Sequence, residues 1–416
     1  MNDRQVTASI ITVGSEILKG KIIDFNSSNI SNYLIKLGIN VKYHLSVSDN
    51  ILDLIRAFKK IEKSDIVITT GGLGPTNDDN TKKAFAEYLN KKLFFDENLW
   101  KELKKYYFIK RENIPESNKK QAMNIKGSEI IENKNGTAPG LFYNYKGKYY
   151  FLLPGPPREN IPMLKKFVIK KLKSKKYTGN PLYEKIIKIY GLGESNLADI
   201  LKNINKNCEI GYYFKREGFI ELHISKQGKN YTQLKEMVDR TLEEIKNKLD
   251  KKKIFYTDNY NLNKLLFLKL KESSRTVSIA DTICGGKISS KIVEIPGSSK
   301  VFTGSIVAYS NNSKIEILDI SQEIIKEHGA VSEKVSREMA ANVRNVFDSD
   351  IGAGITGIAG PNGGTEEKPV GLVYFTINID DKNYSFKREF IGDRKRIINK
   401  TINSLFIELI KLLDKK

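Results

Sequence analysis

The segment DIVITTGGLGPTNDDNT, residues 65–81, decides the fold of the first part of the chain. Its opening run, 65–69, is rich in β-branched apolar residues and predicts a buried strand. A glycine-rich turn follows, and after it apolar residues recur at helical spacing between 84 and 89. A strand that passes through a glycine turn into a helix is typical of a parallel α/β unit. Glycines at that position let backbone amides approach a phosphate closely, at the sheet edge where such folds bind ligands.

Further strands and helices flank this segment on both sides. Buried strands are predicted at 8–13 (ASIITV) and 149–154 (YYFLLP). Glycine-bearing turns stand at strand ends at 14–20 (GSEILKG), 136–140 (GTAPG) and 153–157 (LPGPP). Two helices are indicated by apolar residues at helical spacing: Ile30, Leu34 and Leu37, then Leu54, Ile55, Phe58 and Ile61. The alternation predicts a parallel sheet with helices on both faces.

The composition changes near residue 165, where a lysine-dense stretch ends at Gly179-Asn180-Pro181. Strands and one long helix then predict a small α+β unit, followed by a second linker over 250–263. The predicted elements of this unit are strands at 185–190, 208–214 and 219–225 and a helix through Leu234, Val238 and Leu242.

The α/β pattern returns in the last part of the chain. Strands are predicted at 276–280 and 350–356, a β-hairpin over 371–379 and 384–391, and a closing helix over 393–413. Ser332 is a suitable N-cap for a helix that turns Val335, Met339, Val343 and Val346 inward. We therefore expect three domains, at 1–168, 169–253 and 254–416.

The bulk composition sets limits on function. A chain of 416 residues with 40% hydrophobic and 29% charged residues is globular and too long for one core. Its net charge of +21 comes from lysines scattered over most predicted helices. We interpret it as a solvated surface that attracts anionic nucleotides, and not as a dedicated nucleic-acid site. The sequence shows no secretory signal and no apolar run of 18 residues, and its two cysteines lie far apart, so we expect a cytoplasmic protein without membrane spans or disulfides.

The paired carboxylates Asp78 and Asp79 admit two interpretations. They stand at the start of the helix that follows the glycine turn, where they could cap it. They could equally hold a divalent cation beside a phosphate, because hard cations prefer oxygen ligands. The residues alone leave both open.

The set of turns at 14–20, 71–79, 136–140 and 153–157 resembles the amino-terminal half of the CinA family, over roughly residues 8–165. That half is similar to the MoaB/MogA molybdopterin-binding fold, which implies a three-layer domain. The resemblance also implies a pyrophosphatase that depends on a divalent metal (Mg, Mn or Co) and cleaves ADP-ribose to AMP and ribose 5-phosphate. One departure is Val47-Ser48-Asp49, where the family usually has Val-Gly-Asp. The implied metal or water ligands are Glu16, Asp78, Asp79 and Glu159, and the implied phosphate-lining residues are Gly72, Gly74 and Thr76.

The middle segment resembles the KH-like domain of full-length CinA proteins, with Gly191-Leu192-Gly193-Glu194-Ser195 matching its usual opening. A KH domain that binds nucleic acid clamps the backbone with a GxxG loop. The segment has no such tetrapeptide between two helices, so we interpret it as a structural or dimer-orienting spacer.

The residues of the last part permit hydrolysis of an amide on a phosphorylated ligand. The glycine-rich stretch TGIAGPNGG (356–364) follows a strand and suits an anion. Lys314 can serve as a base if burial lowers its pKa, and the Arg394 guanidinium suits a phosphate. The alternative is that Lys314 is a solvated helix-end lysine and that Arg394 pairs with Asp393.

The last part also resembles the CinA carboxy-terminal domain, the PncC-type deamidase of nicotinamide mononucleotide (NMN), over its whole length. This implies an α/β/α amidase that needs no cofactor, with Thr282, Lys314, Tyr309 and Asp281 as catalytic residues and Thr356, Gly357, Gly360 and Arg394 as substrate-binding residues. The matching segments are ADTICGG (280–286), PGSSKVFTGSIVAYSNNSK (296–314), HGAVSEKVSREMA (328–340), TGIAGPNGG (356–364), KPVG (368–371) and GDR (392–394).

The nucleophile region departs from the family. The usual run is Ala-Glu-Ser-Cys-Thr-Gly-Gly, with serine as the nucleophile, whereas this chain has Ala280-Asp281-Thr282-Ile283-Cys284-Gly285-Gly286. Threonine keeps the hydroxyl but adds a β-methyl that restricts χ1, Asp281 is one methylene short, and the Cys284 thiol is either inert or a substitute nucleophile. The site is then either retuned for slower chemistry or binds nucleotide without turnover.

Two functions of different kinds follow from these residues and resemblances. The first is a homodimeric hydrolase of pyridine-nucleotide recycling that acts on NMN and ADP-ribose. The second is a nucleotide-binding adaptor with a weakened amidase site, since the family's competence/damage-inducible name leaves DNA or repair proteins open as partners. A molybdenum-cofactor role would rest on fold alone, which does not fix function.

Overall fold

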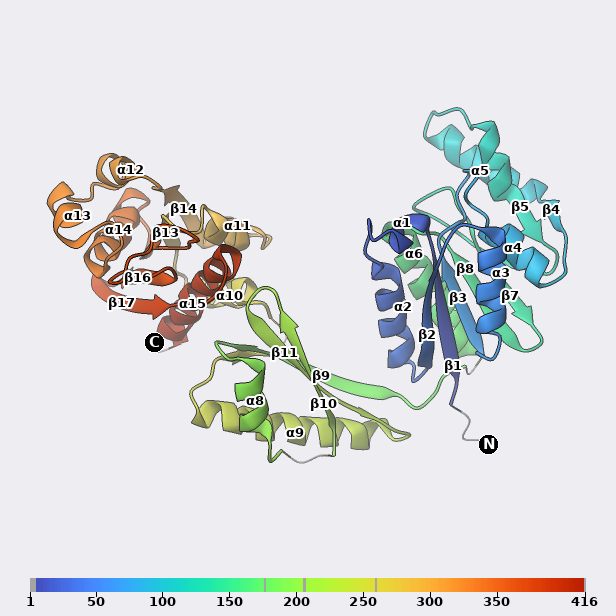
Figure 1. The fold of residues 1–416 in the computed structure, drawn as a ribbon, viewed down its shortest axis with the longest axis horizontal. Helices are drawn as coiled ribbons and strands as arrows, with labels where there is room; N and C mark the ends of the chain where they lie inside the picture. Colours follow the sequence, from blue (N-terminus) through green and yellow to red (C-terminus); the bar gives the residue numbers. More distant parts are fainter. Residues whose placement is uncertain (1–4, 176, 205–206, 259, 415–416) are drawn as a thin grey trace. The chain divides into compact units, whose positions relative to one another are not determined.

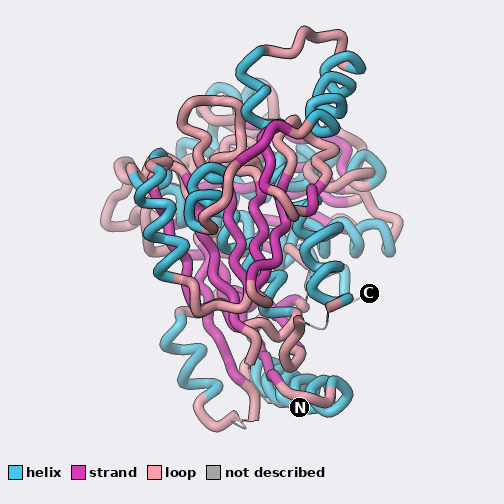
Figure 2. The backbone as a smooth tube through the Cα atoms, turned by 90° about the vertical axis from the view of Figure 1, so that its right-hand side faces the viewer, coloured by secondary structure: helices cyan, strands magenta, loops and turns pink. Residues whose placement is uncertain are grey.

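The computed structural model describes residues 5–175, 177–204, 207–258 and 260–414. Contacts divide the chain into two compact units, Met1–Tyr183 with Lys226–Glu236 and Glu184–Ser225 with Met237–Lys416. Strands and helices alternate along much of the backbone (Figures 1 and 2). The expected α/β class with its three kinds of fold is confirmed, whereas the domain boundaries stay a prediction.

The amino-terminal α/β fold is built on one main sheet. Its strands run in the order β2-β1-β3-β8-β7-β6. β2, β1, β3 and β8 are parallel, and β7 and β6 continue the sheet in antiparallel pairing. The strands are β1 Thr7–Val13, β2 Asn40–Val47, β3 Ile66–Thr70, β6 Glu129–Ile131, β7 Gly140–Tyr145 and β8 Lys148–Leu153, with β4 Leu93–Phe95 and β5 Met123–Ile125 paired separately.

Helices cover both faces of this sheet. One core packs α3 and α4 against it, and the other packs α2, α6, η2 and α7 against the opposite face. All seven residues of β1 are buried, as a central strand between two helical layers requires. The helices are α1 Ser15–Leu18, α2 Phe25–Lys36, α3 Ile51–Lys60, α4 Thr81–Tyr88, α5 Glu97–Ile109, η1 Glu116–Ala122, α6 Pro157–Met163, η2 Leu164–Val168 and α7 Ile169–Ser174.

The register of the parallel strands brings three turns to one edge of the sheet. Thr70 is aligned with Thr12 on one side and with Leu153 on the other. Directly after β3, the backbone N–H of Gly71 donates to the carbonyl of Leu153, with N and O 3.0 Å apart. The turns that follow β1, β3 and β8 therefore lie side by side.

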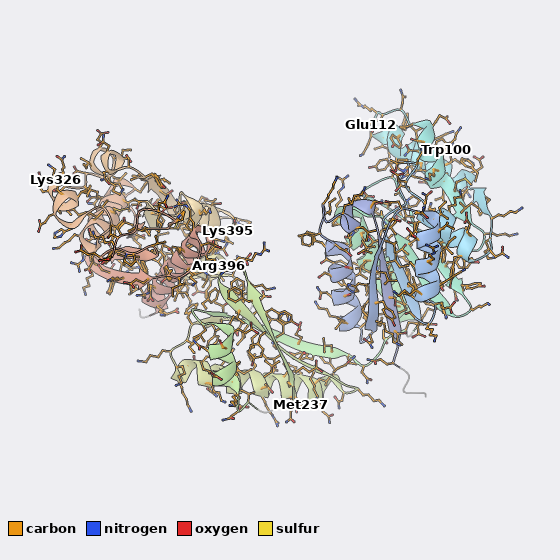
Figure 3. All side chains as sticks on the ribbon, viewed as in Figure 1. Trp100, Glu112, Met237, Lys326, Lys395 and Arg396 are labelled. Atoms are coloured by element: carbon orange, nitrogen blue, oxygen red, sulfur yellow. The ribbon has the colours of Figure 1, made fainter. Side chains whose placement is uncertain are left out.

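A small satellite core supports α5 outside the main sheet. Trp100, which α5 carries (Figure 3), packs with Leu103 and with Ala122 of η1. This contact ties the helix to the segment that precedes β5.

The middle segment forms its own sheet, in the order β10-β11-β9-β12. The segment 250–263, expected as a linker, is not free of secondary structure, since it contains the end of α9, β12 and the start of α10. β12 has two residues and completes the sheet by antiparallel pairing with β9. The elements are β9 Leu182–Tyr190, α8 Glu194–Leu201, β10 Glu209–Lys215, β11 Phe219–Gln227, α9 Tyr231–Lys251 and β12 Tyr256–Thr257.

The carboxy-terminal fold is again a sheet between helical layers. β14, β13 and β15 are parallel, and the hairpin of β16 and β17 extends the sheet beyond β15 in antiparallel pairing. The strands are β13 Val277–Asp281, β14 Phe302–Val307, β15 Ile351–Gly357, β16 Leu372–Ile379 and β17 Lys382–Glu389. The helices are α10 Leu262–Glu272, α11 Lys287–Val293, η3 Ser298–Lys300, α12 Asn311–Glu316, α13 Gln322–His328, α14 Glu333–Val346 and α15 Arg394–Asp414.

Two cores fill the spaces between these layers. α10 and α15 pack on one face of the sheet and α14 on the other. Ser332 caps α14 as predicted, accepting a hydrogen bond from the backbone N–H of Val335. Val335, Met339 and Val343 are buried, but Val346 is 57% exposed at the helix end, so its predicted inward position is wrong.

Candidate functional site

A cavity of about 1000 Å³ lies where the turns after β1, β3 and β8 converge. Val13, Gly71 and Pro154, at or next to the ends of these strands, contribute to its walls. The cavity brings together every amino-terminal site residue that the sequence suggested. These are Glu16, Gly72, Gly74, Thr76, Asp78, Asp79 and Glu159.

The glycine turn is tightly packed against the start of α4. Gly72 has a φ of +68°, and a Cβ on it would lie 2.2 Å from Oγ1 of Thr81. That hydroxyl donates to the carbonyl of Gly71 at 2.8 Å, and the backbone N–H of Thr81 donates to the carbonyl of Gly72 at 3.1 Å. A side chain at position 72 would break this junction, so glycine is required for the shape of the cavity wall.

Asp79 closes the loop that lines the cavity. Its Oδ2 accepts hydrogen bonds from the backbone N–H and the hydroxyl of Thr76, at 2.8 and 2.6 Å. Asn80 is the N-cap residue of α4, and neither aspartate caps the helix. The capping interpretation is therefore wrong, because Asp79 turns back onto the loop. Lys120 donates to the carbonyl of Thr76 at 2.6 Å and holds the same loop from outside.

Glu159 is largely buried at the opposite wall of the cavity. Nδ2 of Asn133 donates to Oε2 of Glu159 at 2.6 Å and also to the carbonyl of Ala138 at 2.9 Å. This amide fixes the turn 133–138 to α6. A Cβ on Gly136 would lie 2.3 Å from the Glu159 carboxylate, so the turn packs closely only because it carries glycine there.

The carboxylates at the cavity do not form a ready-made metal centre. Within the described residues, no group of three or more His, Cys, Asp or Glu side chains is arranged to hold a metal ion. Asp79 and Glu159 are already engaged by Thr76 and Asn133. Mg²⁺ usually takes one or two carboxylates together with substrate phosphates and water. The exposed Glu16 and Asp78 fit that smaller role.

Two residues that the sequence did not single out also shape this cavity. Asp49 accepts hydrogen bonds from the backbone N–H and the hydroxyl of Ser15, at 2.9 and 2.8 Å, and so anchors the turn after β1. Gln121 lines the cavity from η1, and its buried Nε2 has no hydrogen-bond partner among the described residues. No local pattern marks Gln121, because only the tertiary packing of η1 brings it to the sheet edge.

A second, more apolar cleft of about 450 Å³ adjoins the cavity. It lies between α5 and the segment 130–139, and Thr137 lines both spaces. Its apolar lining consists of Leu99, Leu103, Tyr106, Ile109, Ile130 and Pro139.

In the carboxy-terminal fold, Arg394 joins three segments that are far apart in the sequence. Its Nη1 donates to the carbonyl of Gly360 at 2.8 Å, and its Nη2 donates to the hydroxyl of Tyr309 at 3.3 Å. Asp393 instead accepts from the backbone N–H of Arg396 at 2.8 Å. The alternative pairing of Arg394 with Asp393 is therefore wrong.

Lys314 is almost completely buried, with 3% of its surface exposed. Its Nζ lies 3.4 Å from the carbonyl oxygens of Tyr309 and Ser310. Burial lowers the pKa of Lys314, because no carboxylate compensates for the lost hydration of the charged amine. The interpretation as a solvated helix-end lysine is wrong.

The turn after β13 is organised by Asp281. This residue is fully buried, and its two carboxylate oxygens accept from the backbone N–H groups of Ile283, Cys284 and Gly286, at 3.0, 2.7 and 2.8 Å. With its oxygens engaged in this way, Asp281 shapes the turn that carries Thr282. Burial raises the pKa of the Cys284 thiol well above its usual value, which disfavours it as a substitute nucleophile.

Thr282 and Lys314 are not hydrogen-bonded to each other in this structure. The Thr282 hydroxyl donates to the carbonyl of Ile355 at 3.1 Å. The Thr356 hydroxyl likewise donates to a backbone carbonyl, that of Ala330, at 2.8 Å. Gly357 ends β15 beside these residues. The hydrogen bond between a catalytic nucleophile and its base often shortens only when substrate binds. Thr282 and Lys314 therefore stay a predicted nucleophile and base.

Lys368 is a further residue at this sheet edge, and the sequence motifs assign no role to it. Its Nζ donates to the carbonyls of His328 and Val331, at 2.7 and 2.9 Å. It thereby fixes the segment before α14 to the loop that follows β15. The motif KPVG contained this lysine, but nothing in it indicated a backbone clamp.

Comparison with known proteins covers nearly the whole chain. Residues 9–174 match a model described as probable molybdopterin binding domain, 184–255 match the damage-inducible protein CinA KH domain, and 259–413 match the CinA C-terminal domain. The CinA-like protein of Dictyoglomus turgidum is 40% identical over 401 residues, which cover 95% of this chain and 97% of that protein. The CinA-like protein of Dictyoglomus thermophilum has the same identity and coverage.

The chain belongs to the CinA family.

Solved CinA structures match parts of the chain. A CinA protein of unknown function from Thermoplasma acidophilum is 36% identical, with a TM-score of 0.38, over 41% of this chain and 98% of that one. A competence or damage-inducible protein from Enterobacter asburiae is 30% identical, with a TM-score of 0.36, over 36% and 96%. In the described part of this CinA chain, no helix is both long and apolar enough to cross a membrane.

Proposed function

We propose that this CinA protein is a nucleotide hydrolase with two sites, and that its carboxy-terminal site deamidates NMN to nicotinate mononucleotide and ammonia. The observation that carries this assignment is the meeting of Arg394, Tyr309 and Gly360 next to a buried lysine. A guanidinium suits a phosphate group, and a lysine with a lowered pKa supplies a neutral base. Together they suit an amide carried on a phosphorylated ligand.

Each step of the amidase reaction uses groups of this chain. Neutral Lys314 takes the proton of the Thr282 hydroxyl as its oxygen attacks the carboxamide carbon. The attack gives a tetrahedral intermediate, and the protonated amine returns its proton to the nitrogen of that intermediate. The C–N bond then breaks, ammonia departs, and an ester of Thr282 remains. Water hydrolyses this ester, and Arg394 retains the phosphate throughout. This chemistry requires no cofactor.

The assignment is tested by ammonia release from NMN. We expect the purified full chain to release ammonia, and Lys314→Met to reduce the rate by about 10²–10⁴-fold, the usual effect of removing a general base. Lys368→Met is the matched control, because Lys368 clamps two backbone carbonyls nearby without contacting the Arg394 cluster. Equal rates for wild type and heat-denatured protein would exclude an amidase.

The amino-terminal cavity favours a second activity, hydrolysis of ADP-ribose to AMP and ribose 5-phosphate. Its volume of about 1000 Å³ accommodates a dinucleotide-sized ligand. The glycine turn at Gly72 and the start of α4 present backbone N–H groups to phosphates. Glu16 and Asp78 would hold a divalent cation, which when bound neutralises the pyrophosphate and polarises the attacked phosphorus.

AMP formation from ADP-ribose tests this second activity. We expect it to require Mg²⁺, Mn²⁺ or Co²⁺ and to stop when a chelator is added. Asp78→Asn should raise the concentration of metal needed for half-maximal rate, whereas Glu87→Gln, at an exposed carboxylate on α4 that does not line the cavity, should not. AMP formation at full rate in the chelator would contradict the metal assignment.

The competing function is a nucleotide-binding adaptor linked to DNA damage, as the names of related proteins suggest. The observation that favours it concerns two groups. The Arg394 cluster is formed, whereas the Thr282 hydroxyl donates to the carbonyl of Ile355 and not to Lys314. Under this alternative NMN binds without releasing ammonia. Calorimetric binding of NMN together with zero turnover, and retention on DNA that falls steeply with salt, would favour it.

A further inference from the structure

The apolar cleft beside α5 is the basis of an inference that rests on the proposed amino-terminal function. We propose that this cleft binds the aromatic base of a nucleotide whose phosphates occupy the adjoining cavity. Its volume of about 450 Å³ lies in the range of small-molecule sites. The assignment makes a nucleotide, and not a bare pyrophosphate or sugar phosphate, the ligand of this domain.

The two spaces are joined by one turn. Thr137 lines both the cleft and the cavity, and Gly136 next to it lines the cleft, so a ligand that crosses this turn reaches both. On the cavity side, the lining includes Glu159 and the glycine turn after β3. On the cleft side, it includes Leu103, Tyr106 and Ile109 of α5. A nucleotide has the same division, since its phosphates are charged and its base is a flat ring.

The joining turn is fixed in place from the cavity side. Asn133 binds both Glu159 and the carbonyl of Ala138, and Nδ2 of Asn135 donates to the carbonyl of Arg158 at 2.7 Å. Gly136 packs against the Glu159 carboxylate without room for a side chain. The cleft wall is thus formed before a ligand arrives, which lowers the entropy cost of binding.

The other wall is α5, which is held by its own core. Trp100 and Leu103 pack with Ala122, and the hydroxyl of Tyr107 accepts from Nδ2 of Asn118 at 3.1 Å. These contacts fix the helix that presents Tyr106 to the cleft. Aromatic rings are the usual partners for stacked bases and contribute much of the affinity at such sites. Tyr106 is therefore the residue that determines preference for a ligand with a base.

The test compares two probes on the full chain by calorimetry, AMP with a base and inorganic pyrophosphate without one. Tyr106→Ala should weaken AMP binding by roughly 5- to 100-fold and leave pyrophosphate binding unchanged. Tyr106→Phe, which keeps the ring, should retain AMP binding. Phe108→Ala is the matched control, because Phe108 is 83% exposed on the same helix and does not line the cleft.

Several outcomes would overturn the assignment. These are no AMP binding by wild type, unchanged AMP binding in Tyr106→Ala, or an equal loss for both probes. If Tyr106→Ala fails to fold, loss of AMP binding in the folded Tyr106→Phe variant would likewise count against it, because the ring is retained. If wild type binds AMP in this pattern but does not hydrolyse ADP-ribose, the proposed activity fails while the base site stands.

Discussion

At the scale of single residues, we expect Thr282 to decide the rate of the proposed amidase reaction. Its β-methyl restricts χ1, and its hydroxyl donates to the carbonyl of Ile355 and not to Lys314. Thr282→Ser removes the methyl and frees the hydroxyl to turn toward the base. We expect ammonia release from NMN to rise about tenfold, which corresponds to a barrier lowered by about 1.4 kcal/mol.

Cys284→Ala is the control for this substitution. The Cys284 thiol is buried, burial raises its pKa, and the residue belongs to the core cluster of the domain. We expect its removal to leave the rate within about twofold. Loss of activity in Cys284→Ala with no gain in Thr282→Ser would instead make the thiol the nucleophile.

Lys314 sets the pH dependence of the same reaction. Because burial lowers its pKa from the usual 10.5, the neutral amine becomes available at lower pH than for a solvated lysine. The rate of ammonia release should therefore rise with pH through a midpoint below 10.5. A rate that stays constant as pH rises, measured with wild type from neutral to alkaline pH, would exclude Lys314 as the base.

Individual site residues could be predicted from sequence to different extents. Gly72 and Arg394 stand in local motifs, and the structure places each in a cluster with other predicted residues. Their roles in binding stay predictions. Asp281 also stands in a motif, but its position in the turn follows from backbone amides whose directions no spacing shows.

At the scale of elements, a buried lysine connects α4 to the cavity wall. Nζ of Lys82 donates to the carbonyls of Gln121 and Met123, at 2.8 and 3.1 Å. Burial lowers the pKa of Lys82 to about 8, against the opposing attraction of Asp96. A neutral amine still has two N–H donors, so both bonds survive deprotonation.

This lysine makes the stability of the amino-terminal fold depend on pH. Between pH 8 and 10.5 the folded protein releases the Lys82 proton while the unfolded chain retains it, so stability rises with pH. We expect the wild type to gain about 2 kcal/mol over Lys82→Met between about pH 7.5 and 9.5. Urea unfolding followed by the fluorescence of Trp100, the single tryptophan, measures this gain. A difference between the two proteins that is independent of pH would contradict it.

The elements themselves were largely foreseeable, whereas their termini and contacts were not. Buried strands such as β1 and β3 are continuous apolar runs, which local sequence reveals. β12 is only two residues long and pairs with the edge of β9, so the segment expected as a linker gave no sign of it. Likewise η1 reaches the cavity through tertiary contacts with α5 and with Lys82 of α4, and Gln121 was missed for that reason.

At the scale of the whole molecule, the two sites are built from separate parts of the chain. The walls of the amino-terminal cavity come from residues 13–159, and the carboxy-terminal cluster from residues 281–394. The net charge of +21 attracts anionic nucleotides to both alike, so it does not distinguish their ligands. Specificity must then arise within each site.

We therefore expect the two activities to be separable by single substitutions in one chain. Arg394→Ala removes a charged donor to the phosphate of NMN and should raise the KM for NMN about 10- to 100-fold, with ADP-ribose hydrolysis unchanged. Asp79→Ala releases the Thr76 loop and should lower ADP-ribose hydrolysis at least about tenfold, with deamidation unchanged. Both rates are measured on the same preparations. Two sites are coupled when the ligand of each favours the same one of two states of the protein. If one substitution lowered both reactions in parallel, the two sites would be coupled and the expectation of separate activities would be wrong.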